Sequence, residues 1–296
     1  MAPTVGIPKT ISTRTIEGQF LHNRASATEA EFERELEIFR QDAEEAAQYF
    51  SAHCAMHNLA GSLKPVLAYL NRRPMFWVTC SGALQSAAII SLGRIMDNDS
   101  PHNINRLIRM LNDSPQIFDR PALLARKSKG WSDTRPGPKS DLLEEFVASA
   151  YVPRTGELRK FRKTVRRYVK IYEAKYKRIR DEWIAHRVLG DAMEAFPIFA
   201  LTKAGELQRI LAFLLTVHET LWQTFNNGRR LRLPAIRYSV QNMRRQPSIP
   251  ARSASEKIVH EVEMVLVDAA RVKPTKLAWA LQKKELSEGN AKRARR

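Results

Sequence analysis

Residues 155–188 read TGELRKFRKTVRRYVKIYEAKYKRIRDEWIAHRV, and this stretch decides the fold class. Apolar and aromatic side chains recur along it every three or four residues, which is the spacing of one buried face of an α-helix. They are Leu158, Phe161, Val165, Tyr168, Tyr172, Tyr176, Ile179 and Trp183. Gly190 follows shortly afterwards and is typical of a helix C-cap. The stretch is therefore predicted to form one long amphipathic helix.

Helical spacing recurs in three further long stretches of the chain. They are residues 28–58, 75–97 and 203–227. The first begins at Thr28, an N-cap residue, with Glu31 three positions later as in a capping box. The second is apolar on nearly all sides, so we expect it to be the most buried element. Because strand-like alternation is scarce, we predict an all-α protein, an antiparallel bundle of four long helices around one core.

The bundle is predicted to span residues 28–228, with other segments attached to it. Residues 1–27 are expected to be a flexible leader. Residues 103–152 are expected to be a variable insert, irregular over the polar, proline-containing part at 114–140 and helical at its two ends. Residues 229–296 are expected to be a basic C-terminal arm with one or two short helices, although its VEMVLVD segment could also be a strand.

The positive charge of the chain is concentrated in two places. The formal net charge is +18; residues 154–180 carry twelve basic and two acidic residues, and residues 229–296 carry seventeen basic and six acidic ones. The remainder of the chain is therefore slightly acidic. A concentrated basic surface attracts polyanions, of which nucleic acid is the commonest in a cytoplasm. A solvated face that only favours solubility is the alternative.

The sequence favours a cytoplasmic protein. The first residues lack the apolar stretch of a signal peptide, and the longest apolar run, Ile210 to Val217, is far too short to cross a bilayer. Two cysteines, Cys54 and Cys80, fall within predicted helices, where small buried thiols are common. We therefore expect neither a disulfide scaffold nor a membrane partner.

Arg180 and His186 stand at the end of the decisive stretch, within RIRDEWIAHR (178–187). His186 comes three residues after Trp183, so the stripe predicts that it points inward or along the rim of the core. Arg180 flanks the same stripe. A spacing of six residues separates the two side chains by ~9 Å along a helix and by ~120° around it. They could bracket a group of the size of a phosphodiester, or meet their counterparts from a second copy.

These two residue types suit cleavage of RNA. An imidazole titrates near neutral pH and can take the proton of a 2′-hydroxyl or protonate the departing 5′-oxygen. A guanidinium stays charged and can hold two phosphate oxygens while negative charge builds in the transition state. That reaction needs no metal, and a second histidine from another copy could complete the acid–base pair.

The run from Arg180 through Asp181, Glu182, Trp183, Ile184 and Ala185 to His186 resembles the R-x4–6-H motif of HEPN domains. The segment SLGRIMDND (91–99) is similar to the corresponding segment of the abortive-infection subgroup of HEPN-like proteins. The resemblance covers about residues 28–228. It implies a metal-independent endoribonuclease without a cofactor, often a homodimer with a shared cleft, acting in phage defence or with an antitoxin. Some HEPN domains have lost catalysis and only bind nucleic acid or partner proteins.

The resemblance also implies roles for individual residues. His186 is the expected acid–base group, Arg180 the phosphate clamp and Asp181 an orienting residue. Glu182 is expected to hydrogen-bond the imidazole. The remaining supporting residues are Arg187, Arg94 and Asp97, and the residues expected to guide RNA to the site are Arg166, Arg167, Lys170 and Lys177.

Structural interpretations of the same residues remain open. His186 could simply bond within the core, and Arg180 could pair with Asp181 on the surface. The helical spacing of His53 and His57 suits a metal, but no further ligand cluster is visible, which favours packing. Three tyrosines could stack on bases, although their spacing is typical of a core. They are Tyr168, Tyr172 and Tyr176.

Overall fold

The computed structural model describes residues 13–130, 139–186, 199–233 and 254–271. Within these ranges every regular element is a helix and no strand occurs, so the predicted all-α class is confirmed. Predictions for the other residues, Arg187 among them, concern positions outside the described part of the chain.

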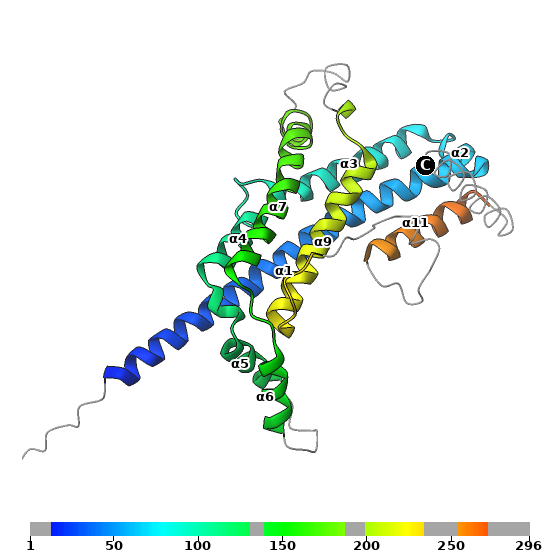
Figure 1. Cartoon of the computed structure of the whole chain (residues 1–296). Helices are drawn as coiled ribbons and strands as arrows, with labels where there is room; N and C mark the ends of the chain where they lie inside the picture. The colour runs from blue at the N-terminus through cyan, green and yellow to red at the C-terminus, as the bar shows by residue number, and fades with distance from the viewer. Residues whose placement is uncertain (1–12, 131–138, 187–198, 234–253, 272–296) are drawn as a thin grey trace, which may run out of the picture.

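Four long helices form the bundle, as two antiparallel pairs that cross (Figure 1). They are α1 (Thr13–Ser62), α3 (Pro74–Met96), α7 (Thr155–Lys175) and α9 (Ala204–Asn227). The short helix α2 (Lys64–Leu70) reverses the chain, so that α3 runs back along α1. Helices α7 and α9 lie side by side, with the rings of Tyr168 and Phe213 stacked at 3.7 Å between centroids.

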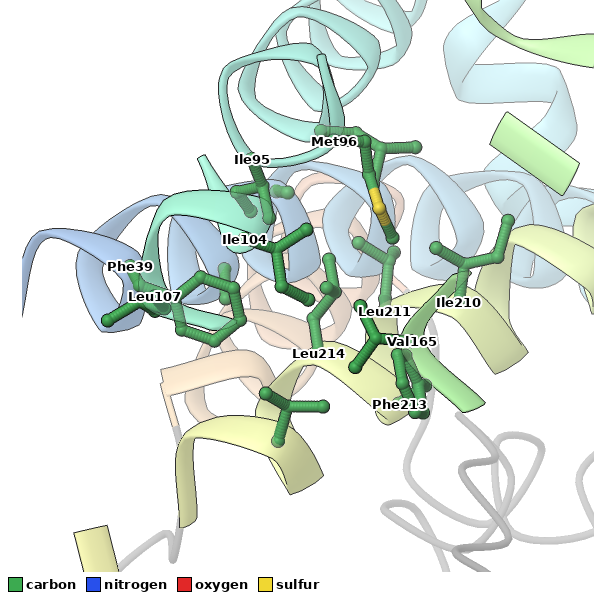
Figure 2. Packing of buried hydrophobic residues seen from close by; sticks show 14 of the residues in the cluster. Phe39, Ile95, Met96, Ile104, Leu107, Val165, Ile210, Leu211, Phe213 and Leu214 are labelled. Atoms are coloured by element: carbon green, nitrogen blue, oxygen red, sulfur yellow. The ribbon is translucent and has the colours of Figure 1, made fainter. Parts of the chain in front are cut away.

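The core lies where the two pairs cross. Figure 2 shows apolar side chains from both pairs and from α4 (Ile104–Asp113) meeting there. Those labelled are Phe39, Ile95, Met96, Ile104, Leu107, Val165, Ile210, Leu211, Phe213 and Leu214. Because Ile104 and Leu107 are fully or almost fully buried in this core, α4 is part of the bundle and not of a peripheral insert.

The predicted irregular stretch at 114–140 is wrong over its first part. A 3-10 turn occupies Pro115–Phe118, and α5 spans Arg120–Gly130. Pro115 and Pro121 stand in the first turns of these elements, where the missing N–H and the fixed φ of proline favour a helix start. Helix α6 (Lys139–Ser149) packs on α5 around a separate small core.

Two further boundaries differ from the prediction, and a third segment, for which a helix or a strand was possible, is helical. Helix α1 already begins at Thr13, within the expected leader and ahead of Thr28. The third long helix does not run unbroken to residue 188, because α7 ends at Lys175. The VEMVLVD segment lies in a helix, α11 (Ala254–Ala269), which packs against α1 and α2 through buried Leu266 and Val267.

Helix α3 is not the most buried element. Its C-terminal half is buried, but Met75 and Val78 in its N-terminal half are 81% and 69% exposed. The C-terminal half contacts α4 and the turn that carries Ile179, in addition to α1. In the described part of the chain, α3 is the one helix that is long and apolar enough to cross a bilayer by those two criteria alone.

Candidate functional site

A π-helical turn, η2 (Ile179–Ala185), carries the Arg180 to His186 motif. The backbone N–H of His186 donates to the carbonyl of Asp181, five residues earlier, at 3.1 Å. A wider turn shifts every later residue relative to the α-helical stripe, so the inward or rim position predicted for His186 is wrong and its side chain is exposed. Turns of this kind occur frequently at functional sites.

Arg180 lies directly on Gly93 of α3. A Cβ atom built on Gly93 would be 2.6 Å from Cδ of Arg180 and 3.1 Å from the hydroxyl of Tyr172. No side chain fits at such distances, so position 93 must lack one for Arg180 to lie there. The SLGRIMD and RDEWIAH segments, distant in the sequence, therefore meet at this point.

Two carboxylates neutralise Arg180. Its Nη2 atom pairs with Asp97, one helical turn beyond Gly93, and its Nε donates to Oδ1 of Asp181 at 2.6 Å. Lys177 also donates to Asp97, with Nζ 3.0 Å from Oδ1. We refer to Gly93, Asp97, Tyr172, Lys177, Arg180 and Asp181 together as the Arg180 cluster.

Asp97 is the buried centre of the Arg180 cluster, with a side chain only 3% exposed. Burial alone would raise the pKa of this carboxyl group. Hydrogen bonds from Lys177, from the backbone N–H of Asp99 and from Arg180 outweigh burial and hold the pKa below its usual value. Asp97 is thus ionised at neutral pH and fixes two cations at the junction of α3 with η2.

Two of the expected supporting residues lie elsewhere. Glu182 pairs with Arg178 at 2.7 Å, one turn away, and not with His186. Arg94 points to α1, where it pairs with Asp42 at 3.0 Å and Glu45 at 3.2 Å. Glu182 therefore does not bond to His186 and Arg94 does not support Arg180, whereas Asp97 contacts Arg180 as expected.

A basic groove of about 580 Å³ lies between α4 and α7. It contains three of the four residues predicted to guide RNA, and the fourth, Lys177, belongs to the Arg180 cluster. Its lining cations are Arg109, Arg162, Lys163, Arg166, Arg167 and Lys170, all exposed. Sequence reasoning missed the first three. The spacing of Arg162 and Lys163 on the polar face of α7 could have found them, but Arg109 joins only through the packing of α4.

The three tyrosines of the apolar stripe and the pair His53 and His57 make contacts within the fold. Tyr172 and Tyr176 are almost completely buried, which excludes base stacking by these two rings, and the ring of Tyr168 is partly buried and stacks on Phe213 of α9. His57 Nε2 lies 2.8 Å from the Ser81 hydroxyl, which lies 3.1 Å from Nδ1 of His53. Within the described ranges, no group of three or more His, Cys, Asp or Glu side chains is arranged to hold a metal ion.

A comparison with known protein families gives a match that includes both segments that meet at the Arg180 cluster. The HEPN-type domain family AbiU2 matches residues 29–244, which include α1 from its fifth turn onward, the motif and the start of the basic arm. No curated protein and no solved structure matches the chain. Since the match covers most of the sequence, the chain belongs to the AbiU2 family of HEPN-like abortive-infection proteins.

Proposed function

We propose that this protein is a metal-independent endoribonuclease in which His186 acts as the general acid–base group. Membership of the AbiU2 family implies an abortive-infection role in phage defence. In the proposed reaction a 2′-oxygen attacks the adjacent phosphorus, the bond to the 5′-oxygen breaks, and a 2′,3′-cyclic phosphate and a 5′-hydroxyl result. One imidazole removes the 2′-proton, and a second, from another copy of the chain, protonates the leaving oxygen.

The observation that carries this proposal is the exposure of His186 beside an anchored arginine. The imidazole is open to solvent, and its backbone is bonded to Asp181, which in turn holds Arg180. A ribose can reach this side chain without any opening of the core. The neighbouring α4–α7 groove offers unpaired positive charge for the approach of RNA.

Arg180 can reach a phosphate by exchanging one of its carboxylates. Asp97 is buried, but the Asp181 side chain is 32% exposed and can turn away into water. A phosphate oxygen would then take the place of the Asp181 carboxylate, while Asp97 keeps the guanidinium in position. In this proposal Asp97 is a positioning residue and Asp181 a displaceable partner.

A non-catalytic module that binds nucleic acid or an antitoxin is the second candidate. The pairing of Arg180 with both Asp97 and Asp181 favours it, because a neutralised guanidinium in contact with Gly93 can serve the fold alone. Such a module would bind RNA through the groove cations and have no need of His186.

Replacement of His186 separates the two candidates. We expect His186→Ala to abolish cleavage of RNA assayed in the presence of EDTA, with the wild-type products ending in a 2′,3′-cyclic phosphate. His260→Ala is the matched control, since His260 is equally exposed but lies on α11. Cleavage that persists in His186→Ala, or that depends on added divalent metal, would remove His186 from the mechanism.

A further inference from the structure

The α4–α7 groove gathers unpaired cations in one place, with Glu173 as the one acid among the residues that line it. Six basic side chains line it, and within the described ranges none of them forms an ion pair. Arg109 comes from α4 and the others from α7, so two elements build the groove. Concentrated, unpaired charge of this kind is the footprint of a polyanion site.

The groove lacks the groups that hold unpaired bases. Single-stranded nucleic acid is usually held by aromatic rings on which bases stack, and no aromatic side chain lines the groove. The aromatic rings of α7 face the core instead. Three amide side chains accompany the cations: Asn98, Asn105 and Asn112. Cations and amides are suited to phosphate oxygens and 2′-hydroxyls, which an A-form helix presents along its wide minor groove.

We infer that the α4–α7 groove binds a double-helical segment of the RNA substrate through its sugar–phosphate backbone. The inference rests on the proposed function in taking RNA as the ligand, and it adds that recognition is of a stem, independent of sequence. Base edges in the deep major groove of A-form RNA are out of reach of side chains, so shape and 2′-hydroxyls are what such a surface can read.

The groove leads towards the Arg180 cluster. Asn98 lines it and is the sequence neighbour of Asp97, the central carboxylate of the cluster. On the other side, Glu173 of α7 lines the groove, and Lys177 of the cluster follows four residues later, just beyond the end of α7. When a stem occupies the groove, the nucleotide that reaches His186 therefore lies outside the base pairs that the groove holds. We expect cleavage in the unpaired RNA that flanks a stem.

Binding of three labelled probes to the full chain tests this inference. The probes are an RNA duplex of about 16 base pairs, the DNA duplex of the same sequence and one RNA strand alone, compared by fluorescence anisotropy at several salt concentrations. We expect the RNA duplex to bind at least about tenfold more tightly than the single strand or the DNA, because only A-form RNA offers both phosphates and 2′-hydroxyls in register. Equal or tighter binding of the single strand would overturn the inference.

Charge reversal in the groove locates the site. Arg162→Glu with Arg166→Glu should weaken duplex binding roughly tenfold or more and lower the salt dependence by about one unit of slope per lost phosphate contact. Arg72→Glu with Arg73→Glu is the matched control, since these exposed arginines lie in the turn between α2 and α3. Duplex affinity that falls equally in both double variants would mean a diffuse charge effect and no groove site.

The catalytic proposal and this inference fail separately. His186→Ala should lose cleavage but keep full affinity for the duplex, whereas the groove variant should lose affinity for the duplex, which the binding assay measures without any cleavage. If the groove variant keeps its affinity for RNA but no longer binds an acidic partner protein, the groove is a protein-docking surface and the inference is wrong, whatever His186 does.

Discussion

The Arg180 cluster and the α4–α7 groove take cations from the same basic stretch of sequence but surround them differently. Apart from Arg109 of α4, all these cations come from residues 162–180, which span most of α7 and the start of η2. In the Arg180 cluster, Arg180 and Lys177 face Asp97 and Asp181, whereas the groove cations face solvent. The difference comes from what packs beside the stretch. The C-terminus of α3 brings a carboxylate to one part, and α4 brings another arginine to the other.

This contrast separates cations that already have an acidic partner in the folded protein from cations that have none. Removal of the carboxylate beside a partly buried cation leaves that charge uncompensated, and such a cation can bind a phosphate only by exchanging its partner. An exposed, unpaired cation adds nothing to stability, but its charge remains available to attract a polyanion. Substitution in the Arg180 cluster should therefore change stability, and substitution in the groove should change binding.

Loss of the central carboxylate should have the largest effect. Asp97→Ala leaves Arg180 and Lys177 without their shared partner, and we expect the free energy of unfolding to fall by about 2–4 kcal/mol, measured by urea denaturation. Asp99→Ala is the control, because that side chain is 91% exposed and 3.8 Å from Lys177; it should cost less than ~0.5 kcal/mol. Equal losses in the two variants would mean that Asp97 does not hold the cluster together.

A methyl group on Gly93 should have the next largest effect. Its Cβ would displace Arg180, so Gly93→Ala is expected to lower stability by about 1–2 kcal/mol and to weaken RNA cleavage through misplacement of the motif. Gly82→Ala, on the same helix with nothing within 4 Å, should instead raise stability by roughly 0.5 kcal/mol. Opposite signs in thermal unfolding would show that the close approach, and not helix propensity, decides the result.

Acidification should weaken the Arg180 cluster through Asp97. Its pKa lies below the ordinary 3.8 in the folded protein, so its contribution to stability is complete at neutral pH. As the pH falls below about 4 the carboxyl group becomes protonated and the contribution is lost. The stability difference between the wild type and Asp97→Asn should therefore shrink between about pH 6 and pH 3. A difference that stays constant over this range would contradict the pairing.

The sequence could predict the bundle and the meeting of its two motif segments. Periodicity identified the four long helices, and the resemblance of SLGRIMDND and the motif to one family placed Asp97 near Arg180. It could not predict the π-helical turn that exposes His186, because the choice between i→i+4 and i→i+5 bonds depends on packing around Ile179 and not on residue type.

Burial was harder to predict than helicity. The apolar composition of α3 was read as deep burial, but composition does not say which neighbours cover a helix, and the N-terminal half of α3 leaves Met75, Phe76 and Val78 exposed. The same limit applies to charge. Arg94, Arg166 and Arg180 look alike in sequence, yet one pairs with α1, one stands free in the groove and one lies on Gly93.

Charge reversal in the groove should have the smallest effect on stability. Arg166→Glu with Arg167→Glu removes two exposed, unpaired cations, so the free energy of unfolding should change by less than ~0.5 kcal/mol, with any change favourable because repulsion among the groove cations falls. Urea denaturation of this variant beside Asp97→Ala measures the contrast directly. A loss above ~1 kcal/mol would mean that the groove cations hold the fold as Arg180 does, and they would then have no charge to spare for a stem of RNA.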